Sequence, residues 1–182
     1  HEEVGYNYRM SNVIAGVVRG QYGYLEEHIE AKKKIYERYK KGLKGLPVQM
    51  NPIMEGTEPN YWLCAMIIDE ASMCRQVRGD SDALYIPESG KSCPTEILEA
   101  IISINAEGRP IWKPMHLQPM YRMNECIGRE GSMRARTNAY IAGGAPDVGA
   151  DIFARGVCLP SDNKMTEEEQ DRIIAVIRAC FE

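Results

Sequence analysis

The chain has 182 residues, which suits one ordinary domain that buries roughly 70% of the surface its unfolded form exposes. Its 22 lysines and arginines are outnumbered by 26 aspartates and glutamates, and the net charge of -4 lacks the clustered basic excess of a nucleic-acid-binding protein. No uncharged apolar run approaches the roughly 18 to 20 residues of a membrane span. We therefore expect neither nucleic acid nor a membrane as a partner.

The cysteines do not have the spacing of a metal site. There are six of them: Cys64, Cys74, Cys93, Cys126, Cys158 and Cys180. No two form a Cys-x-x-Cys pair, and no histidine offers metal-site spacing with them. Because the sequence also shows no basic-then-apolar leader, we expect reduced thiols, no metal ligands and a cytoplasmic location.

Two helices are predicted at the start of the chain. Ser11 is suited to cap the first, in which apolar residues between Val13 and Val18 share one face. From Tyr24 onward, apolar residues recur at the i, i+3, i+4 spacing of an amphipathic helix as far as Gly42, where a glycine favours the end of the helix. The three lysines at positions 32–34 of this helix lie among glutamates and indicate a solvated face.

The remaining elements predict a mixed α/β domain. The segment NYWLCAMIID, residues 60–69, alternates too little for a half-exposed strand and predicts a strand covered on both faces. Pro94 is placed to begin a short helix. Thr166 and Glu169 form a capping-box pattern ahead of the last helix.

Residues 128–149, GREGSMRARTNAYIAGGAPDVG, form the one clear shift in composition. They combine glycine, alanine and arginine and show no apolar period. We therefore expect a mobile loop within the domain rather than a linker between two domains.

The sequence has no complete phosphate-binding loop and no nucleophile-elbow motif. YIPESGKS ends in the Gly-Lys-Ser of a phosphate-binding loop, but Tyr85 stands where that loop requires its first glycine. None of the three histidines lies beside a Gly-x-Ser-x-Gly nucleophile elbow, and His28 lies on an amphipathic helix, where packing or surface placement is the ordinary role. His116 alone remains a candidate for a functional role.

The most unusual segment is EGRPIWKPMHLQPMY, residues 107–121, which we call the proline-rich block. Its three prolines, Pro110, Pro114 and Pro119, are expected to exclude regular structure and to stiffen the loop. Arginine, lysine, histidine and tryptophan side chains in one such segment suit an anionic ligand that also carries a flat ring or a sugar. The alternative is that Trp112 and Met115 are core plugs under a proline-rich connection, and composition alone leaves both interpretations equally open.

Four segments follow one another in the order of a known family. They are HEEVGYNYRMSNVIAGVVRGQ, PNYWLCAMIID, RPIWKPMHLQPMY and ADIFARGVCLPSDNKMTEEEQDRII. In this order they resemble the C-terminal half of the pyridoxal-phosphate-dependent nucleotide-sugar aminotransferases of the DegT/StrS type. The resemblance spans nearly the whole chain, and the four ordered blocks make it specific.

The resemblance implies a fold and an assembly. The expected fold class is α/β, the C-terminal small domain of a fold type I pyridoxal-phosphate-dependent transferase, with a small, mostly antiparallel sheet packed with helices and preceded by long helices. Residues 1–45 would form an interdomain or dimer-contact segment with a long helix. Residues 46–182 would form the small α/β domain, with 128–149 as a mobile insertion. The implied assembly is a homodimer with a shared active site.

The resemblance also implies an activity and site residues. The activity is transfer of an amino group from an amino acid, commonly glutamate, to a nucleotide-linked keto-sugar, with pyridoxal 5'-phosphate as the cofactor. Asn7 matches the family's contact to the cofactor phosphate, and an amide N–H can donate to a phosphate oxygen without adding charge. The alternative is that Asn7 only satisfies a turn.

Substrate contacts are expected mainly in the proline-rich block, which looks like the family's sugar-nucleotide contact region. The candidates there are Trp112, Lys113 and His116. Arg9 is a further substrate candidate, although ordering the loop or meeting an acidic group of the dimer is the favoured role. The three arginines of residues 128–149, Arg129, Arg134 and Arg136, either reach toward a phosphate or a neighbouring subunit or, as we expect, belong to a solvated loop.

Part of the machinery that such an enzyme needs is not recognisable in this chain. An aminotransferase holds its cofactor through a lysine, as a Schiff base, and no lysine here stands in a context that resembles the family's. We therefore expect no catalytic residue in the chain, an N-terminal cofactor-binding domain that is absent from it, and a fragment that is inactive alone. Loss of that domain would expose the apolar face of the first helix and favour self-association or partial disorder at the N-terminus. The alternative is a non-catalytic relative that uses the scaffold for sensing or assembly.

Overall fold

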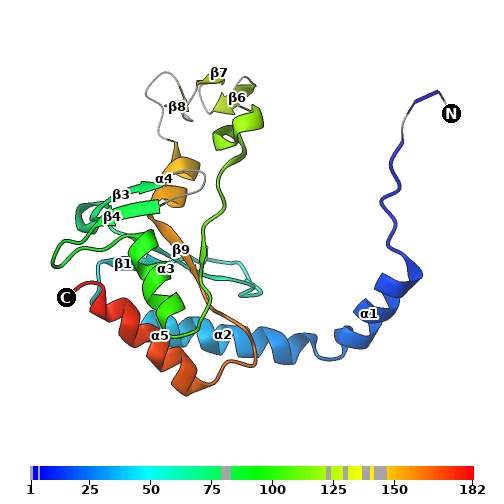
Figure 1. The fold of residues 1–182 in the computed structure, drawn as a ribbon. Helices are drawn as coiled ribbons and strands as arrows, with labels where there is room; N and C mark the ends of the chain where they lie inside the picture. The colour runs from blue at the N-terminus through cyan, green and yellow to red at the C-terminus, as the bar shows by residue number, and fades with distance from the viewer. Residues whose placement is uncertain are drawn as a thin grey trace.

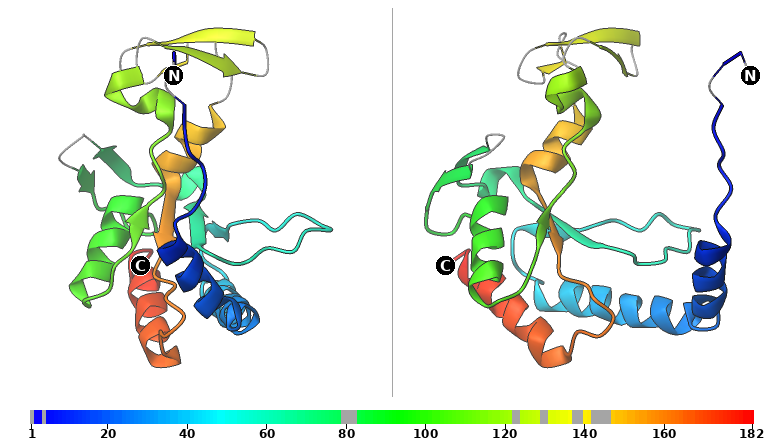
Figure 2. Two further views of the ribbon diagram at one scale, coloured as in Figure 1. Left: turned by 90° about the vertical axis from the view of Figure 1, so that its right-hand side faces the viewer. Right: turned by 45° about the vertical axis from the view of Figure 1, so that its right-hand side comes forward.

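The computed structural model describes residues 2–3, 5–78, 83–121, 124–128, 131–136, 140–141 and 147–182. Figure 1 shows a small sheet with helices gathered against it and, apart from this body, a helix that carries an extended N-terminal segment. We call that segment, residues 5–11, the N-terminal arm. The right-hand view in Figure 2 shows the same separation between the arm and the sheet.

Both predicted N-terminal helices are confirmed. Helix α1 spans Asn12–Tyr22 and begins as expected, because the Oγ of Ser11 accepts a hydrogen bond from the backbone N–H of Ile14 at 3.3 Å. Helix α2 spans Leu25–Gly42. None of the residues of α1 is buried, whereas the second half of α2 enters the core. The division at residue 45 remains a prediction, and the end of α2 packs with the elements that follow it.

The main sheet has four strands in the order β1, β2, β9, β5, and each neighbouring pair is antiparallel. Their bounds are Val48–Met50 for β1, Cys64–Ile68 for β2, Arg109–Pro110 for β5 and Gly156–Leu159 for β9. The expected antiparallel sheet is therefore confirmed. Strand β2 is shorter than predicted: it begins at Cys64, and alternate residues are buried and half-buried, so one of its faces is covered more completely than the other.

Three helices supply most of the core that packs against this sheet. Helix α3 spans Pro94–Ser103 with its proline in the first turn, as predicted, and helix α5 spans Glu167–Ala179. Figure 1 shows α3, α5 and the end of α2 close together beside the sheet. The buried cluster joins residues of all these elements: Ile35, Tyr36, Tyr39, Leu43, Met50, Cys64, Met66, Ile68, Ile97, Ile101, Val157, Leu159, Ile173, Ile174 and Ile177.

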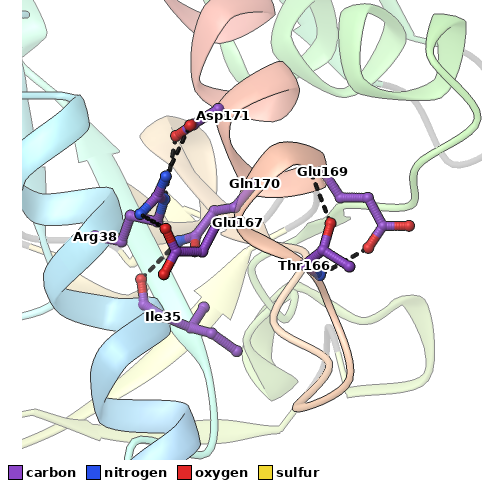
Figure 3. A network of polar contacts seen from close by, with 7 residues as sticks. All are labelled: Ile35, Arg38, Thr166, Glu167, Glu169, Gln170 and Asp171. Carbon is purple, nitrogen blue, oxygen red and sulfur yellow. Dashed lines mark hydrogen bonds and ion pairs between the residues drawn. The ribbon is translucent and has the colours of Figure 1, made fainter.

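Polar contacts lock α2 to α5, as Figure 3 shows. The guanidinium of Arg38 meets both carboxylate oxygens of Asp171, at 3.1 and 2.7 Å, and an oxygen of Glu167 at 2.8 Å. Beneath them, the side-chain amide of Gln170 donates to the carbonyl oxygen of Ile35 at 2.7 Å in a buried position. Exposed ion pairs contribute little to stability. The buried hydrogen bond from Gln170 to Ile35 is therefore the more specific contact between the two helices.

The start of α5 gives a direct test of the capping-box prediction, which the structure confirms. The Oγ1 of Thr166 accepts from the N–H of Glu169 at 3.2 Å, and the Glu169 carboxylate accepts from the N–H of Thr166 at 2.8 Å (Figure 3). We expect Thr166→Ala to lower the free energy of unfolding by about 1 kcal/mol in urea denaturation. Thr166→Ser keeps the hydroxyl and is the matched control; equal losses in the two variants would contradict the capping role.

The Gly-Lys-Ser that resembles part of a phosphate-binding loop, residues 90–92, follows a separate hairpin. Strands β3 (Arg75–Arg78) and β4 (Ala83–Ile86) pair antiparallel after the short 3₁₀ helix η1 (Glu70–Ser72). Gly90 has a φ of 76° in the turn between Glu88 and Lys91, and the side chains of these two residues form an ion pair at 2.6 Å. The motif lies directly ahead of α3, whose N-cap is Cys93. Ser92 is 0% exposed and its Oγ donates to the carboxylate of Glu96 at 2.7 Å, so both polar side chains of the motif have partners within the protein.

Regular structure occurs where the composition predicted a loop. The described residues form strands β6 (Glu125–Gly128), β7 (Gly131–Arg136) and β8 (Tyr140–Ile141), paired in that order, and helix α4 (Val148–Arg155) begins inside the predicted range. Short hairpins form through local backbone pairing and need no long apolar period, which explains the difference. Mobility remains a prediction. Arg129 and the side chains of Arg134 and Arg136 lie outside the described residues.

The described residues have neither a membrane-spanning helix nor a cluster of metal-ligating side chains. No helix among them is long and apolar enough to cross a membrane. No group of three or more histidine, cysteine, aspartate or glutamate side chains among them is placed to hold a metal ion. Five cysteines are described as free thiols: Cys64, Cys74, Cys93, Cys158 and Cys180.

Candidate functional site

The proline-rich block forms one edge of the main sheet and then turns away from it. Strand β5 pairs with β9 through Arg109 opposite Cys158 and Pro110 opposite Val157. An edge strand tolerates a proline, so the expectation that the prolines exclude regular structure is wrong at this point. Two 3₁₀ helices follow, η2 (Met115–Leu117) and η3 (Pro119–Tyr121).

The two side chains considered as core plugs are exposed to solvent. Trp112 is 63% exposed and Met115 is 62% exposed, so neither is a core plug. A second tryptophan, Trp62, is 66% exposed, and its ring centroid lies 6.4 Å from that of Trp112 with 37° between the ring planes. The sequence predicted that Trp62 belongs to a buried strand. In the structure β2 begins only at Cys64, so Trp62 precedes the strand and its ring lies beside the proline-rich block.

The two tryptophans line a cleft of about 700 Å³, which we call the Trp cleft. Its other polar lining residues are Lys32, Glu107, Arg109, Lys113, Ser161 and Asp162. Lys32, on α2, donates from Nζ to the carbonyl oxygen of Ser161, and Arg109 forms an ion pair with Glu107. Two of the predicted substrate residues, Trp112 and Lys113, therefore line the same cleft, together with Arg109, the arginine of the proline-rich block. Lys32 is half-buried there, so the predicted solvated face is wrong for this lysine.

His116 is directed to a different partner. Its Nε2 lies 2.6 Å from Oδ2 of Asp147, and the other carboxylate oxygen of Asp147 accepts from the N–H of Ala150 at 2.9 Å, which caps α4. His116 does not line the Trp cleft. The predicted substrate role of His116 is not tested by this contact. Asp147 was not among the predicted site residues, although an aspartate directly ahead of VGADIFAR is a recognisable N-cap signal.

The contact between His116 and Asp147 ties the proline-rich block to α4. Packing supports the tie, because a side chain at Gly149 would lie 3.3 Å from Pro114. We expect Asp147→Ala to lower the free energy of unfolding by about 1 to 2 kcal/mol, since it removes the cap and the histidine contact together. Asp147→Asn keeps both hydrogen-bonding positions and is the matched control. Urea denaturation measures the free energy of unfolding of both variants. An alanine variant as stable as the unaltered protein would show that Asp147 does not stabilise the contact between the proline-rich block and α4.

The N-terminal arm carries the other predicted site residues. Oδ1 of Asn7 accepts from the backbone N–H of Arg9 at 3.1 Å and from its side-chain Nε at 3.4 Å. Among the described residues, Nδ2 of Asn7 has no hydrogen-bond partner, so its N–H groups suit an acceptor such as a phosphate oxygen. Figure 2 shows the arm standing away from the sheet, so this chain does not bring Asn7 and Arg9 to the Trp cleft.

The arm and α1 also expose many large hydrophobic side chains. The large hydrophobic side chains that are exposed there are Tyr6, Tyr8, Met10, Val13, Ile14, Val17, Val18 and Tyr22. Soluble domains seldom leave so many neighbouring apolar side chains without a cover. Self-association of the isolated chain through this surface remains a prediction.

The thiol near the Trp cleft is not suited to nucleophilic chemistry. Cys158 lines the cleft but is 5% exposed, and burial raises the pKa of its thiol. A thiol with a raised pKa is protonated at neutral pH and is a weak nucleophile. The cleft is therefore equipped for binding through rings and cations.

Comparison with known proteins identifies the family. The family model described as DegT/DnrJ/EryC1/StrS aminotransferase family matches residues 1–178. EpsN of Bacillus subtilis (strain 168), which is named as a pyridoxal phosphate-dependent aminotransferase, is 33% identical over 182 residues, all of this chain and 38% of EpsN. GDP-perosamine synthase of Vibrio cholerae is 31% identical over 121 residues, which are 66% of this chain and 28% of the synthase.

Solved structures agree with this assignment at the level of the fold. DesI, solved in the presence of its TDP-sugar product, superimposes with a TM-score of 0.67 at 18% identity, over 97% of this chain and 37% of DesI. The α/β fold of this chain thus matches part of an aminotransferase structure. The chain belongs to the DegT/DnrJ/EryC1/StrS aminotransferase family, whose members depend on pyridoxal phosphate, and it spans less than two fifths of the length of EpsN.

Proposed function

We propose that this chain is the C-terminal part of a sugar aminotransferase that moves an amino group from an amino acid, glutamate in the first instance, to a nucleotide-linked keto-sugar. The observation that supports this best is the family match from residue 1 to 178. Two of the similar proteins carry names that refer to nucleotide sugars, GDP-perosamine synthase and the DesI structure with its TDP-sugar product. The Trp cleft has the chemistry for such a ligand, since it combines flat rings with cations.

In this proposal the chain contributes binding groups and the remaining part of the protein contributes the lysine. Pyridoxal phosphate supplies an electron sink for the amino transfer when it is bound. Asn7 donates from Nδ2 to the cofactor phosphate of a second subunit, while Arg9 holds the amide by donating to its oxygen. A homodimer with shared sites explains why the arm stands apart from its own cleft (Figure 2). The chain alone would be inactive, and the cytoplasm would be its location.

Absorbance spectroscopy tests this proposal. Pyridoxal phosphate is titrated into the longer protein and into this chain alone, and glutamate is then added. The proposal predicts a bound-cofactor band in the longer protein that changes when glutamate is added, and no such band in the chain alone. A longer protein that binds no cofactor would overturn the proposal and leave a non-catalytic relative; a band in the chain alone would overturn the placement of the lysine.

Within the same experiment, Asn7→Ala tests the arm. Removal of one charge-assisted hydrogen bond to phosphate is expected to weaken cofactor binding by about tenfold or more, since such bonds contribute about 1.5 to 3 kcal/mol. Asn60→Ala is a suitable control, because Asn60 is also exposed and its Oδ1 likewise accepts a local backbone N–H, that of Trp62, at 3.0 Å. Equal cofactor affinity in the Asn7 variant and the unaltered protein would remove Asn7 from the cofactor site.

A further inference from the structure

Two buried cysteines follow the two halves of a β-bridge between the β3–β4 hairpin and the start of α3. Met73 and Ser92 form this bridge, which is parallel. In it, the N–H of Ser92 donates to the carbonyl oxygen of Ser72 at 3.1 Å, and the N–H of Cys74 donates to that of Ser92 at 3.0 Å. Cys74 and Cys93 are the next residues on the two sides of the bridge, and they are 3% and 0% exposed.

The bridge brings these two cysteines to the separation that a disulfide requires. Paired strands lie roughly 4.8 Å apart, and the Cα atoms of disulfide-bonded cysteines are usually about 4.4 to 6.8 Å apart. The backbone of Cys93 is extended, with a φ of -146° and a ψ of 163°, so its side chain leaves the bridge on the same side as that of Cys74. Cys93 is the N-cap of α3 but makes no side-chain cap hydrogen bond, so its thiol is not directed to the helix.

The other described thiols do not share this arrangement. Cys64 and Cys158 are on neighbouring strands, β2 and β9, but Cys158 pairs with Ala65, the residue after Cys64. Because successive residues of a strand point to opposite faces, these two thiols lie on opposite faces of the sheet. The Sγ of Cys180 donates to a carbonyl oxygen of α5 at 3.2 Å. Among the described residues, the backbone therefore places one pair for a direct bond.

We propose that Cys74 and Cys93 are a redox modification site, a thiol pair that hydrogen peroxide converts into a disulfide. One thiol attacks the O–O bond, becomes a sulfenic acid and releases water; the other thiol then displaces a second water as the S–S bond forms. Two sulfurs are oxidised, one peroxide is reduced to two waters, and the waters take up both thiol protons. The inference goes beyond the proposed function and does not depend on it.

Burial makes this site a slow one. Burial, together with the contact to Cys93, raises the pKa of the Cys74 thiol. Since the thiolate is the reactive form, the pair resists oxidation while the hairpin is closed and reacts when the hairpin opens.

The bond would fix the hairpin to α3 covalently. Hydrogen bonds at 3.1 Å already join the two, from the hydroxyl of Tyr85 to the carboxylate of Glu99 and from the hydroxyl of Thr95 to the side chain of Gln76. A disulfide here closes a loop that contains the whole hairpin and so restricts the unfolded chain. The oxidised protein is therefore expected to resist denaturation better than the reduced one.

Peptide mapping of the longer protein tests the site. The folded protein is incubated with hydrogen peroxide for hours, free thiols are blocked with N-ethylmaleimide, and glutamyl endopeptidase cuts after glutamate. This leaves Cys74 alone in the peptide 71–88 and Cys93 alone in the peptide 89–96. We expect the two peptides to be joined by a bond that a reductant breaks. Peptides that stay separate, or a bond from Cys93 to Cys180 in place of the expected one, would overturn the proposal.

Variants separate a direct pair from other routes to oxidation. Cys93→Ser puts a favoured residue at the N-cap of α3, and Cys74→Ala is a second, independent variant; both should lose the joined peptides. Cys180→Ser removes a half-buried thiol outside the pair and is the matched control, which should keep them. Loss of the joined peptides in Cys180→Ser as well would contradict a direct bond.

Urea denaturation followed by circular dichroism measures the effect on the fold. The oxidised protein should unfold at a higher urea concentration than its reduced form, whereas peroxide should not raise the midpoint of Cys93→Ser. Equal midpoints for the oxidised and reduced forms of the unaltered protein would overturn the covalent attachment of the hairpin to α3.

Discussion

Replacement of Ile101 by alanine is expected to lower the free energy of unfolding by about 2 to 5 kcal/mol. Ile101 lies on α3, is 0% exposed and belongs to the core cluster that joins the sheet to three helices. The variant loses buried apolar contacts and leaves a cavity that the surrounding side chains fill only in part. A small domain has about 5 to 15 kcal/mol of stability in total, so this single change removes a large share.

The neighbouring residue provides the control. Ile102 is on the same helix and is 61% exposed, so Ile102→Ala removes the same atoms from a position that is mostly in water. We expect a change below about 0.5 kcal/mol for the control, because surface substitutions away from specific contacts have small effects. Urea denaturation monitored by circular dichroism measures both. Similar losses in the two variants would contradict the placement of the core on that face of α3.

Alkaline pH is expected to destabilise the fold steeply. Burial raises the pKa of the Cys64 thiol from its ordinary 9.0 to about 11, and burial also raises the pKa of Cys180 to about 11. Tyr39 is 0% exposed and donates to the carbonyl oxygen of Pro160 at 2.8 Å, and burial raises the pKa of its hydroxyl above the ordinary range. All three groups are therefore held in their protonated forms by the fold.

The sign of the pH effect follows from proton binding. Above pH 9 the unfolded chain begins to lose thiol protons that the folded chain keeps. This ionisation stabilises the unfolded state relative to the folded state. Stability is full below the ordinary thiol pKa and falls as the pH rises through the interval from 9 to about 11. For the fully buried Cys64, a shift of this size corresponds to about 3 kcal/mol.

Urea denaturation at a series of pH values between neutral and 11 measures the effect, under reducing conditions that keep the thiols free. In Cys64→Ala one titrating group is gone, and the fall in stability over the same interval should become shallower by the amount assigned to Cys64. The comparison is made between slopes, because the substitution itself alters stability at neutral pH. A wild-type chain whose stability is constant across this interval would contradict the buried thiols.

The regular elements of this fold were predictable because local signals determine them. The hydroxyl of Ser11, the proline at position 94 and the Thr166 capping box each mark a helix start, and each helix begins where its signal stands. Apolar spacing gave α2 and α5 correctly for the same reason. These signals act within a few residues, so one sequence is enough to read them.

The candidate site was less predictable because its geometry is set by contacts between distant segments. Composition marked Trp112 and Lys113, but nothing local indicates that Trp62 leaves the strand and meets Trp112. Asp147 was missed because the glycine- and arginine-rich composition around it suggested a loop. Its role as the N-cap of α4 depends on a single local hydrogen bond, from the N–H of Ala150. The side-chain contact between His116 and Asp147 joins distant segments, and it directs His116 away from the Trp cleft.

The resemblance to a family gave what the residues alone could not. No physical feature of Asn7 distinguishes a cofactor contact from a turn, and its oxygen does take part in a local turn with Arg9. Family membership, now shown for the chain, gives the remaining amide N–H groups a candidate partner in the cofactor phosphate. The apolar face of α1 is likewise exposed, because no described residue of this chain packs over it. Such a face is consistent with a chain that covers only part of the length of its relatives.

Amino transfer itself tests the central claim most directly. The longer protein is incubated with pyridoxal phosphate, ¹⁵N-labelled glutamate and a nucleotide-linked keto-sugar, and the products are analysed by mass spectrometry. We expect a nucleotide-linked amino sugar that carries the label, and 2-oxoglutarate in equal amount. If the cofactor binds but no label leaves the glutamate for any of the uridine-, guanosine- and thymidine-linked keto-sugars, the account is contradicted.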